Sequence, residues 1–280
     1  MGGGAFTDGP GGGSGKAEFF TPVTFDFLWE EGGLGELPYP LRVRSHGETE
    51  AQRVSLRERA RQELKARGLH DHFGRLEPHV EDWLTVLSRP LLRIDALHIP
   101  DYQAPPVGIL AASDGRTGVI AIQNADGIWL RPTFAEGLAS AVVDLLPPGT
   151  RGTEASITLP VAEALRIPPN RVAVPAGGGA EEPRSRRRSP LSDQVADPRE
   201  SYARLAGQPR LRGGQLAANS RNELSGWRRS PVLAWFDTAS GRYLSLARPG
   251  ADGREWVTVA PADTKTLRTR LTEMVSLVSG

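Results

Sequence analysis

The spacing of apolar residues in the first ninety positions predicts helices before any strand. Apolar side chains recur at helical intervals in Phe25–Glu31 and in Glu77–Leu87. The charged stretch Glu48–Arg67 has one apolar side, and Gly68 is placed to end that helix. Two prolines keep Pro38–Val43 out of helix, so we expect it to be extended. The inward-facing residues of the two longer helices are predicted to be Leu56, Ala60, Leu64, Val80, Trp83, Leu84 and Leu87.

From residue 91 the pattern changes to short apolar runs, which glycine and aspartate turns separate. Such runs are typical of β-strands that follow one another in a meander. The predicted strands are Leu91–Ile99, Val107–Ala112, Val119–Gln123 and Ile128–Arg131. Thr133 and Glu136 fit the T-x-x-E pattern of a capping box, and the stripe from Leu138 to Leu146 predicts a helix that ends at Pro147.

The same order of strands and helix returns near the C-terminus. The predicted strands there are Gln215–Ser220, Val232–Phe236, Tyr243–Leu246 and Trp256–Val259. Pro261 is expected to open a final helix whose apolar side consists of Leu267, Leu271, Met274, Leu277 and Val278. An Asp-Gly pair precedes Trp256 much as one precedes Trp129, so we predict two similar halves, about 19–150 and 151–280. Chance agreement is the alternative, because this order of elements is common.

Two segments hold too few apolar residues to join a folded core. Residues 1–18 form a glycine-rich lead, and Pro175–Pro198 combines glycines, prolines and a cluster of arginines. We expect disorder in both segments and a single folded domain over 19–280. Between the halves, Glu154–Leu159 is predicted to be a strand and Val161–Leu165 a short helix.

Composition and charge exclude several classes of protein. Hydrophobic residues make up 39% of the chain, which is enough for a sizeable core. The net charge of +1 provides no overall field that would favour nucleic acid or an anionic membrane. The sequence contains no cysteine, which rules out disulfides and thiolate chemistry. Neither a signal peptide nor a run of about 20 apolar residues is found, so we expect a soluble cytoplasmic protein.

Patterns that resemble catalytic or ligand-binding motifs are incomplete. Gly11–Lys16 resembles a phosphate loop, but Pro10 stands where its first glycine belongs. Gly33–Gly35 has no strand before it, as a dinucleotide loop requires. The pair of histidines in His70–His72 lacks the spacing of a zinc-binding helix, and no G-x-S-x-G elbow occurs. We expect no catalytic residue, cofactor or metal, although a triad assembled in space leaves no such pattern.

Two groups of residues are candidates for binding a protein partner. The first lies in the predicted connection after Ile99, where apolar and aromatic residues have no evident packing role; the second is a tryptophan beside two arginines in a predicted turn. The alternatives are an ordinary surface loop and a tryptophan that covers the edge of its own core. The candidate residues are Ile99, Asp101, Tyr102, Trp227, Arg228 and Arg229.

Two stretches carry a family resemblance. The sequence F-D-F-L-W-E-E-G-G-L-G-E-L-P-Y-P-L-R-V at Phe25–Val43 resembles the opening of EspG proteins. The sequences R-G-G-Q-L at Arg212–Leu216 and W-F-D-T-A-S-G-R-Y-L at Trp235–Leu244 resemble their C-terminal half. The likeness extends over about residues 19–280, and the glycine-rich lead and the arginine-containing loop depart from it.

The resemblance implies an α+β fold with quasi-twofold halves around a central antiparallel sheet and flanking helical bundles. It also implies a chaperone of type VII (ESX) secretion, which binds the helical tip of a PE/PPE pair, keeps it soluble and delivers it to the secretion machinery. Substrate contacts would then lie near the strand loop after Ile99 and on the C-terminal half. The competing hypotheses are an unrelated regulatory binding module and, third, an enzyme.

Overall fold

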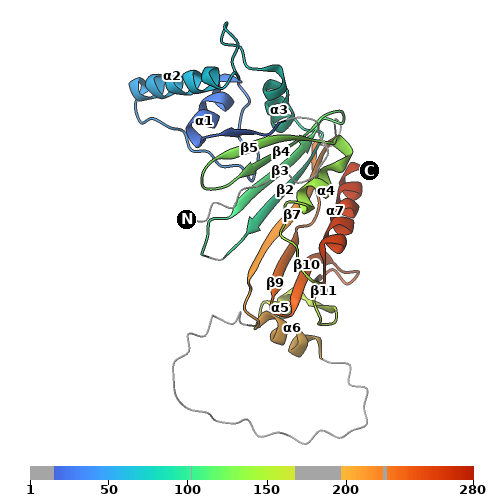
Figure 1. The fold of residues 1–280 in the computed structure, drawn as a ribbon. Helices are drawn as coiled ribbons and strands as arrows, with labels where there is room; N and C mark the ends of the chain where they lie inside the picture. The colour runs from blue at the N-terminus through green and yellow to red at the C-terminus, as the bar shows by residue number, and fades with distance from the viewer. Residues whose placement is uncertain (1–15, 102, 168–196, 223–225) are drawn as a thin grey trace, which may run out of the picture.

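A computed structural model describes residues 16–101, 103–167, 197–222 and 226–280 (Figure 1). The helices are α1 (Pro22–Glu31), α2 (Glu50–Ala66), α3 (Pro78–Ser88), α4 (Leu138–Val143), α5 (Val161–Ala164), α6 (Pro198–Ala206) and α7 (Thr264–Ser279). The strands are β1 (Glu18–Phe20), β2 (Leu92–Ile99), β3 (Val107–Ser113), β4 (Gly118–Gln123), β5 (Ile128–Thr133), β6 (Ile157–Pro160), β7 (Arg212–Asn222), β8 (Gly226–Arg229), β9 (Leu233–Thr238), β10 (Gly241–Pro249) and β11 (Glu255–Pro261).

The strands form one 11-stranded sheet in the order β1-β5-β4-β3-β2-β7-β9-β10-β11-β6, with β8 also paired to β7. Every strand pair is antiparallel, which confirms the predicted α+β class with an antiparallel sheet. Each meander starts at the central β2–β7 pair and runs outward, and an earlier strand, β1 or β6, closes its edge. The division into two similar halves agrees with this order and stays a prediction.

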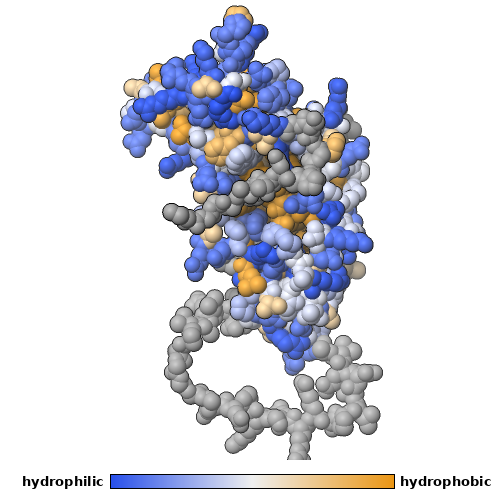
Figure 2. Space-filling view, viewed as in Figure 1, coloured by the Kyte–Doolittle hydropathy of each residue, from blue (hydrophilic) through white to orange (hydrophobic). Residues whose placement is uncertain are grey.

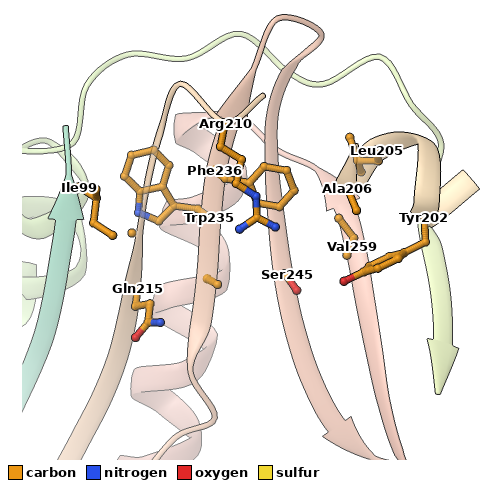
Figure 3. Close-up of a pocket in the computed structure, with 12 residues that line it drawn as sticks. Ile99, Tyr202, Leu205, Ala206, Arg210, Gln215, Trp235, Phe236, Ser245 and Val259 are labelled. Carbon is orange, nitrogen blue, oxygen red and sulfur yellow. The ribbon is translucent and has the colours of Figure 1, made fainter. Parts of the chain in front are cut away.

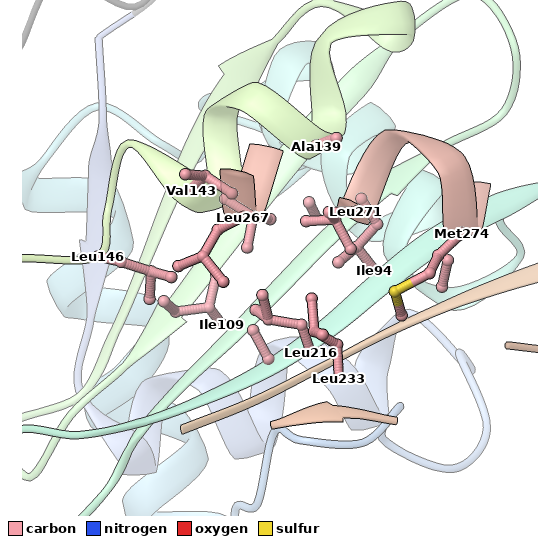
Figure 4. Close-up of a cluster of buried hydrophobic side chains, with 14 of the residues drawn as sticks. Ile94, Ile109, Ala139, Val143, Leu146, Leu216, Leu233, Leu267, Leu271 and Met274 are labelled. Atoms are coloured by element: carbon pink, nitrogen blue, oxygen red, sulfur yellow. The ribbon is translucent and has the colours of Figure 1, made fainter. Parts of the chain in front are cut away.

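Helices cover the two faces of the sheet differently. One face packs on α4 and α7 along its middle, where Leu267 and Leu271 meet Ile94 and Leu216 (Figure 4). The described helices cover the opposite face at its two ends: α1 and α3 lie over β3 to β5, and α5 and α6 lie over β6, β10 and β11. Successive side chains of a strand point to opposite faces of the sheet, so each strand contributes to the core under α4 and α7 with every second residue and to the opposite face with the others.

Helix ends follow local capping chemistry. The Thr21 hydroxyl accepts from the Thr24 N–H at 3.1 Å and Pro22 follows it, so α1 starts before the predicted Phe25. Thr49 and Gln52 form a capping box at the start of α2. Only Ala60 and Leu64 are buried on α2, and Figure 2 shows mostly hydrophilic residues over this helix.

Three predicted helix features are wrong. Thr133 does not cap a helix: it pairs with Gly118 as the last residue of β5, and the 3-10 helix Ala135–Gly137 follows without a side-chain cap. Pro261 ends β11 rather than opening α7, whose cap is Asp263. Leu277 is exposed because it lies about 100° around the helix from the buried Val278.

The boundaries of two other segments also differ from those predicted. Glu18, assigned to the lead, begins β1, where it pairs with Leu130. Residues 175–196 of the predicted disordered loop lie outside the described residues, and so do residues 1–15 of the lead. Pro198, placed at the end of that loop, is the first residue of α6, which Asp197 caps by accepting from the Arg199 N–H at 2.9 Å.

A charged cluster is buried where β9 ends and β10 begins. The carboxylate of Asp237 accepts from Arg242 at 2.7 and 2.9 Å and from Arg212 at 2.6 Å. Burial alone would raise the pKa of Asp237, but the hydrogen bonds from the two arginines outweigh it, and this pKa lies below its ordinary value. Above the cluster, the His98 ring stacks on Trp235 with 5.6 Å between ring centroids.

His98 is expected to make the protein less stable in mild acid. Burial, and then Arg212 and Arg242, lower the pKa of His98, and this outweighs the opposing effects of Gly213 and Asp237. The unfolded chain therefore binds the proton more readily, and the contribution of neutral His98 is lost as pH falls below about 6.5. Melting curves should show that the parent loses more stability than His98→Gln between pH 7.5 and pH 5. Equal losses in the two proteins would contradict this.

Candidate functional site

No described helix covers the middle of the second sheet face, between the two helical covers. Side chains there alternate with those that pack under α4 and α7, so they point to the other side. We call this surface the open strip. Its residues are Leu97, Ile99, Gln215, Ala234, Ser245 and Ala247, all of which are partly or fully exposed. In contrast, the neighbouring positions Leu110 and Tyr243 are fully covered.

A cavity of about 210 Å³ lies where the open strip meets α6. Tyr202 and Leu205 of α6 form one wall, and Ile99 and Phe236 belong to the sheet side. Figure 3 shows Arg210 beside the ring of Phe236, with the guanidinium carbon 4.5 Å from the ring centroid. The cavity therefore offers apolar walls with one cation at its rim.

A second cavity, of about 250 Å³, lies on the other side of the open strip, toward the N-terminal helices. Its lining includes Tyr39, Leu97 and Pro106. Gln123 fixes the neighbouring chain by accepting from the Arg42 N–H and donating to the Arg42 carbonyl, both at 2.7 Å. The two cavities flank the exposed end of β2.

A polar network occupies the opposite end of β2. Asp95 is only 3% exposed, and it accepts from Arg229 at 2.8 and 3.0 Å and from Asn219 at 2.5 Å. The hydrogen bond from Arg229 to Asp95 is the main cause that raises the pKa of Arg229. Trp227 lies beside this network and is 46% exposed, with the guanidinium carbon of Arg93 4.4 Å from its ring centroid.

The structure places the predicted binding residues in several environments. Ile99 lines the cavity beside α6, and the exposed Asp101 accepts from the Gln103 N–H at 3.0 Å. Tyr102 lies outside the described residues. Trp227 is not in a turn: it belongs to β8 and pairs with Arg221, because β7 extends beyond the predicted end of its strand.

The two arginines after Trp227 point to opposite faces. Arg229 pairs with Asp95 on the open face, whereas Arg228 donates to the Leu277 carbonyl of α7 on the covered face, at 3.3 Å. Ile99 and Trp227 lie at opposite ends of β2, so roughly 20 Å separates the two groups. The structure therefore does not bring them together as one cluster.

Sequence reasoning missed the wall formed by α6. Asp197 followed by Pro198 is a helix-start signal, and Tyr202 and Leu205 are spaced to share one side of a helix. Within the described part of the chain, no three histidine, aspartate or glutamate residues lie together as a metal site requires. None of the described helices is long and apolar enough to cross a membrane.

Comparison with known proteins decides the family. The model of the EspG family matches residues 21–273. The chain belongs to the EspG family. A solved structure with a similar fold is that of the Mycobacterium tuberculosis type VII secretion system chaperone EspG5 in complex with the PE25–PPE41 dimer. The two structures superpose with a TM-score of 0.66 at 15% sequence identity. The match covers 93% of this chain and 96% of the other. None of the curated proteins compared matches this EspG sequence.

Trp227 is expected to contribute little to the stability of the fold. Because its ring is half exposed, Trp227→Ala in this EspG protein should lower the free energy of unfolding by about 1 kcal/mol or less. Trp83→Ala, at a tryptophan 5% exposed in α3, is the matched control and should cost about 3 to 5 kcal/mol. Denaturant titrations of both variants test this. A loss at Trp227 as large as that at Trp83 would show that its role is structural.

Proposed function

We propose that this chain is a cytoplasmic chaperone of type VII secretion that binds a helical PE–PPE pair, keeps it soluble and delivers it for export. Membership of the EspG family carries the proposal. The likeness in fold to a chaperone whose structure includes a PE–PPE dimer supports it. No catalytic step is part of the proposal.

The open strip is the proposed docking surface. It spans β2, β7, β9 and β10, and three gaps between strands give a width of about 15 Å. A helix with its side chains is about 10 to 12 Å across, so the tip of a helical pair fits between the two covers. The covers are packed on separate cores, which makes the walls of the strip rigid.

The chemistry of the open strip also suits a helix tip. A tip exposes apolar side chains, and its last carbonyls lack intrahelical partners. Ile99 and Phe236 in the cavity beside α6 offer apolar contacts, while Gln215 and Arg210 offer N–H donors. Ile99 is thus proposed to contact the partner directly, and Trp227 is proposed to contact it at the other end of β2. Asp101 and Tyr102 are proposed to border the contact.

Coexpression with a PE–PPE dimer encoded beside the chaperone gene tests the proposal. We expect a stable ternary complex on size exclusion, and more soluble PE–PPE with the chaperone than without it. A PE–PPE dimer truncated at the helical tip is the matched control and should not bind. If neighbouring PE–PPE dimers stay unbound at micromolar concentration and low salt, the proposed function is wrong.

A further inference from the structure

Asp95, the single described acidic residue in the polar network beside Trp227, accepts three hydrogen bonds from within the protein. Both oxygens of Asp95 accept from Arg229, and Oδ1 also accepts from Asn219. Asn219 in turn accepts from Arg229 through its own Oδ1 at 2.8 Å. Arg229 is therefore satisfied within the protein, and Asp95 has little capacity left for a second cation.

Arg93 is the cation that this network leaves without a partner. It stands two residues before Asp95 on the same face of β2, next to Asn219 of β7. Its Nε is buried, and among the described residues it has neither a hydrogen-bond partner nor a carboxylate that forms an ion pair with it. The Trp227 ring covers one side of the guanidinium.

Arg93 therefore holds donors that no described carboxylate uses. A guanidinium that stacks by its flat side on an aromatic ring keeps its N–H groups at the edge, where they can meet a carboxylate with two parallel hydrogen bonds. Burial also lowers the pKa of Arg93, and the opposing effect of Asp95 does not offset it. Partial burial without a counterion is unfavourable, so an incoming anion would be stabilising here.

We propose that Arg93, with Trp227 as its stacking platform, is a recognition point for an aspartate or glutamate side chain of the helical partner. The inference rests on the proposed function and extends it to the chemistry of the partner. An acidic side chain attached to a protein fits better than a free anion, because its aliphatic stem can pack on the half-exposed Trp227 ring.

The spacing of the strip adds a geometric requirement for the partner. Arg93 and Ile99 are both on the open face of β2, six residues apart, which corresponds to about 20 Å. A helix covers that distance in about 13 residues. Both side chains must also face the sheet, so a partner helix that lies along β2 should carry its acidic residue about 14 positions, or four turns, from the apolar residue that enters the cavity beside α6.

Titration calorimetry of the full chain with a purified PE–PPE dimer tests the recognition point. We expect Arg93→Gln to bind about tenfold more weakly, and its affinity to fall less steeply with salt than that of the parent. Arg93→Lys keeps the charge but loses the planar donors, and it should fall between the two. Arg270→Gln makes the same change on α7, on the other side of the sheet, and should match the parent.

The outcomes separate this inference from the proposed function. If the parent binds and Arg93→Gln binds within about twofold with the same salt dependence, the recognition point is refuted while the chaperone function stands. If the parent binds no PE–PPE dimer, both are refuted. Should Arg93→Gln fail to fold, Arg93→Lys replaces it: weaker binding than that of the parent supports the recognition point, and binding equal to that of the parent overturns it.

Discussion

Asp237→Ala is expected to lower the free energy of unfolding by about 3 to 5 kcal/mol, the loss that follows when one partner of a buried ion pair is removed. Arg242 is 1% exposed and would keep only its hydrogen bond to the Pro147 carbonyl, at 2.8 Å. Its guanidinium would then be a buried charge without a counterion. Chemical denaturation, with the midpoint and the slope measured together, gives the loss directly.

The matched control for this substitution is Asp252→Ala. Asp252 also pairs with an arginine, Arg254 at 2.9 Å, but the pair lies on the surface. Solvent screens an exposed ion pair, so this variant should stay close to the parent. Should Asp237→Ala cost no more than Asp252→Ala, the buried cluster would not hold β9 and β10 in place as we argue.

The sequence predicted those helices and strands in which buried residues recur at a regular spacing within one segment. In α7, Leu267, Leu271, Met274 and Val278 recur at helical spacing and all four are buried as predicted. The strands of the first meander likewise lie where the apolar runs stand. Such a segment presents one apolar stripe to one core, so the local sequence pattern is sufficient to predict the element.

Elements held by distant contacts were missed or misplaced. Gly213 and Gly214 carry no side-chain pattern, yet they belong to β7, and a Cβ on Gly214 would come within 2.2 Å of the Leu97 carbonyl oxygen. The polar segment of β8 becomes a strand through its pairing with β7, and Arg229 finds Asp95 across 134 positions of sequence. No local pattern contains this information.

Only part of the candidate site could be predicted from the sequence, because its contacts join residues that are distant along the chain. The alternation in β2 places Arg93 and Asp95 on one side and Ile94 and Ala96 on the other, a signal that one face of a central strand is not apolar. Which arginine pairs with Asp95 depends on the fold. The sequence pointed to Arg228 and Arg229 as partner contacts, and only the fold shows that Arg93 has no ion-pair partner among the described residues.

Gln215→Trp is expected to weaken partner binding strongly without unfolding the protein. Gln215 is exposed at the centre of the open strip, between Leu97 of β2 and Ala234 of β9. An exposed strand position accepts tryptophan readily, so the melting temperature should change little. The indole would fill the space that the helix tip needs, and we expect affinity to fall by about 100-fold or more, as for loss of a hot spot.

Thr272→Trp provides the matched control, because Thr272 is exposed on α7, on the opposite side of the sheet. Added bulk there should leave affinity within about twofold of the parent. Calorimetry with the same PE–PPE dimer measures the affinity of both variants, and their melting temperatures show that both are folded. If Gln215→Trp bound as tightly as Thr272→Trp, the partner would dock elsewhere, since a tryptophan at the centre of a 15 Å wide strip, about the span of four strands, cannot be accommodated under a seated helix tip.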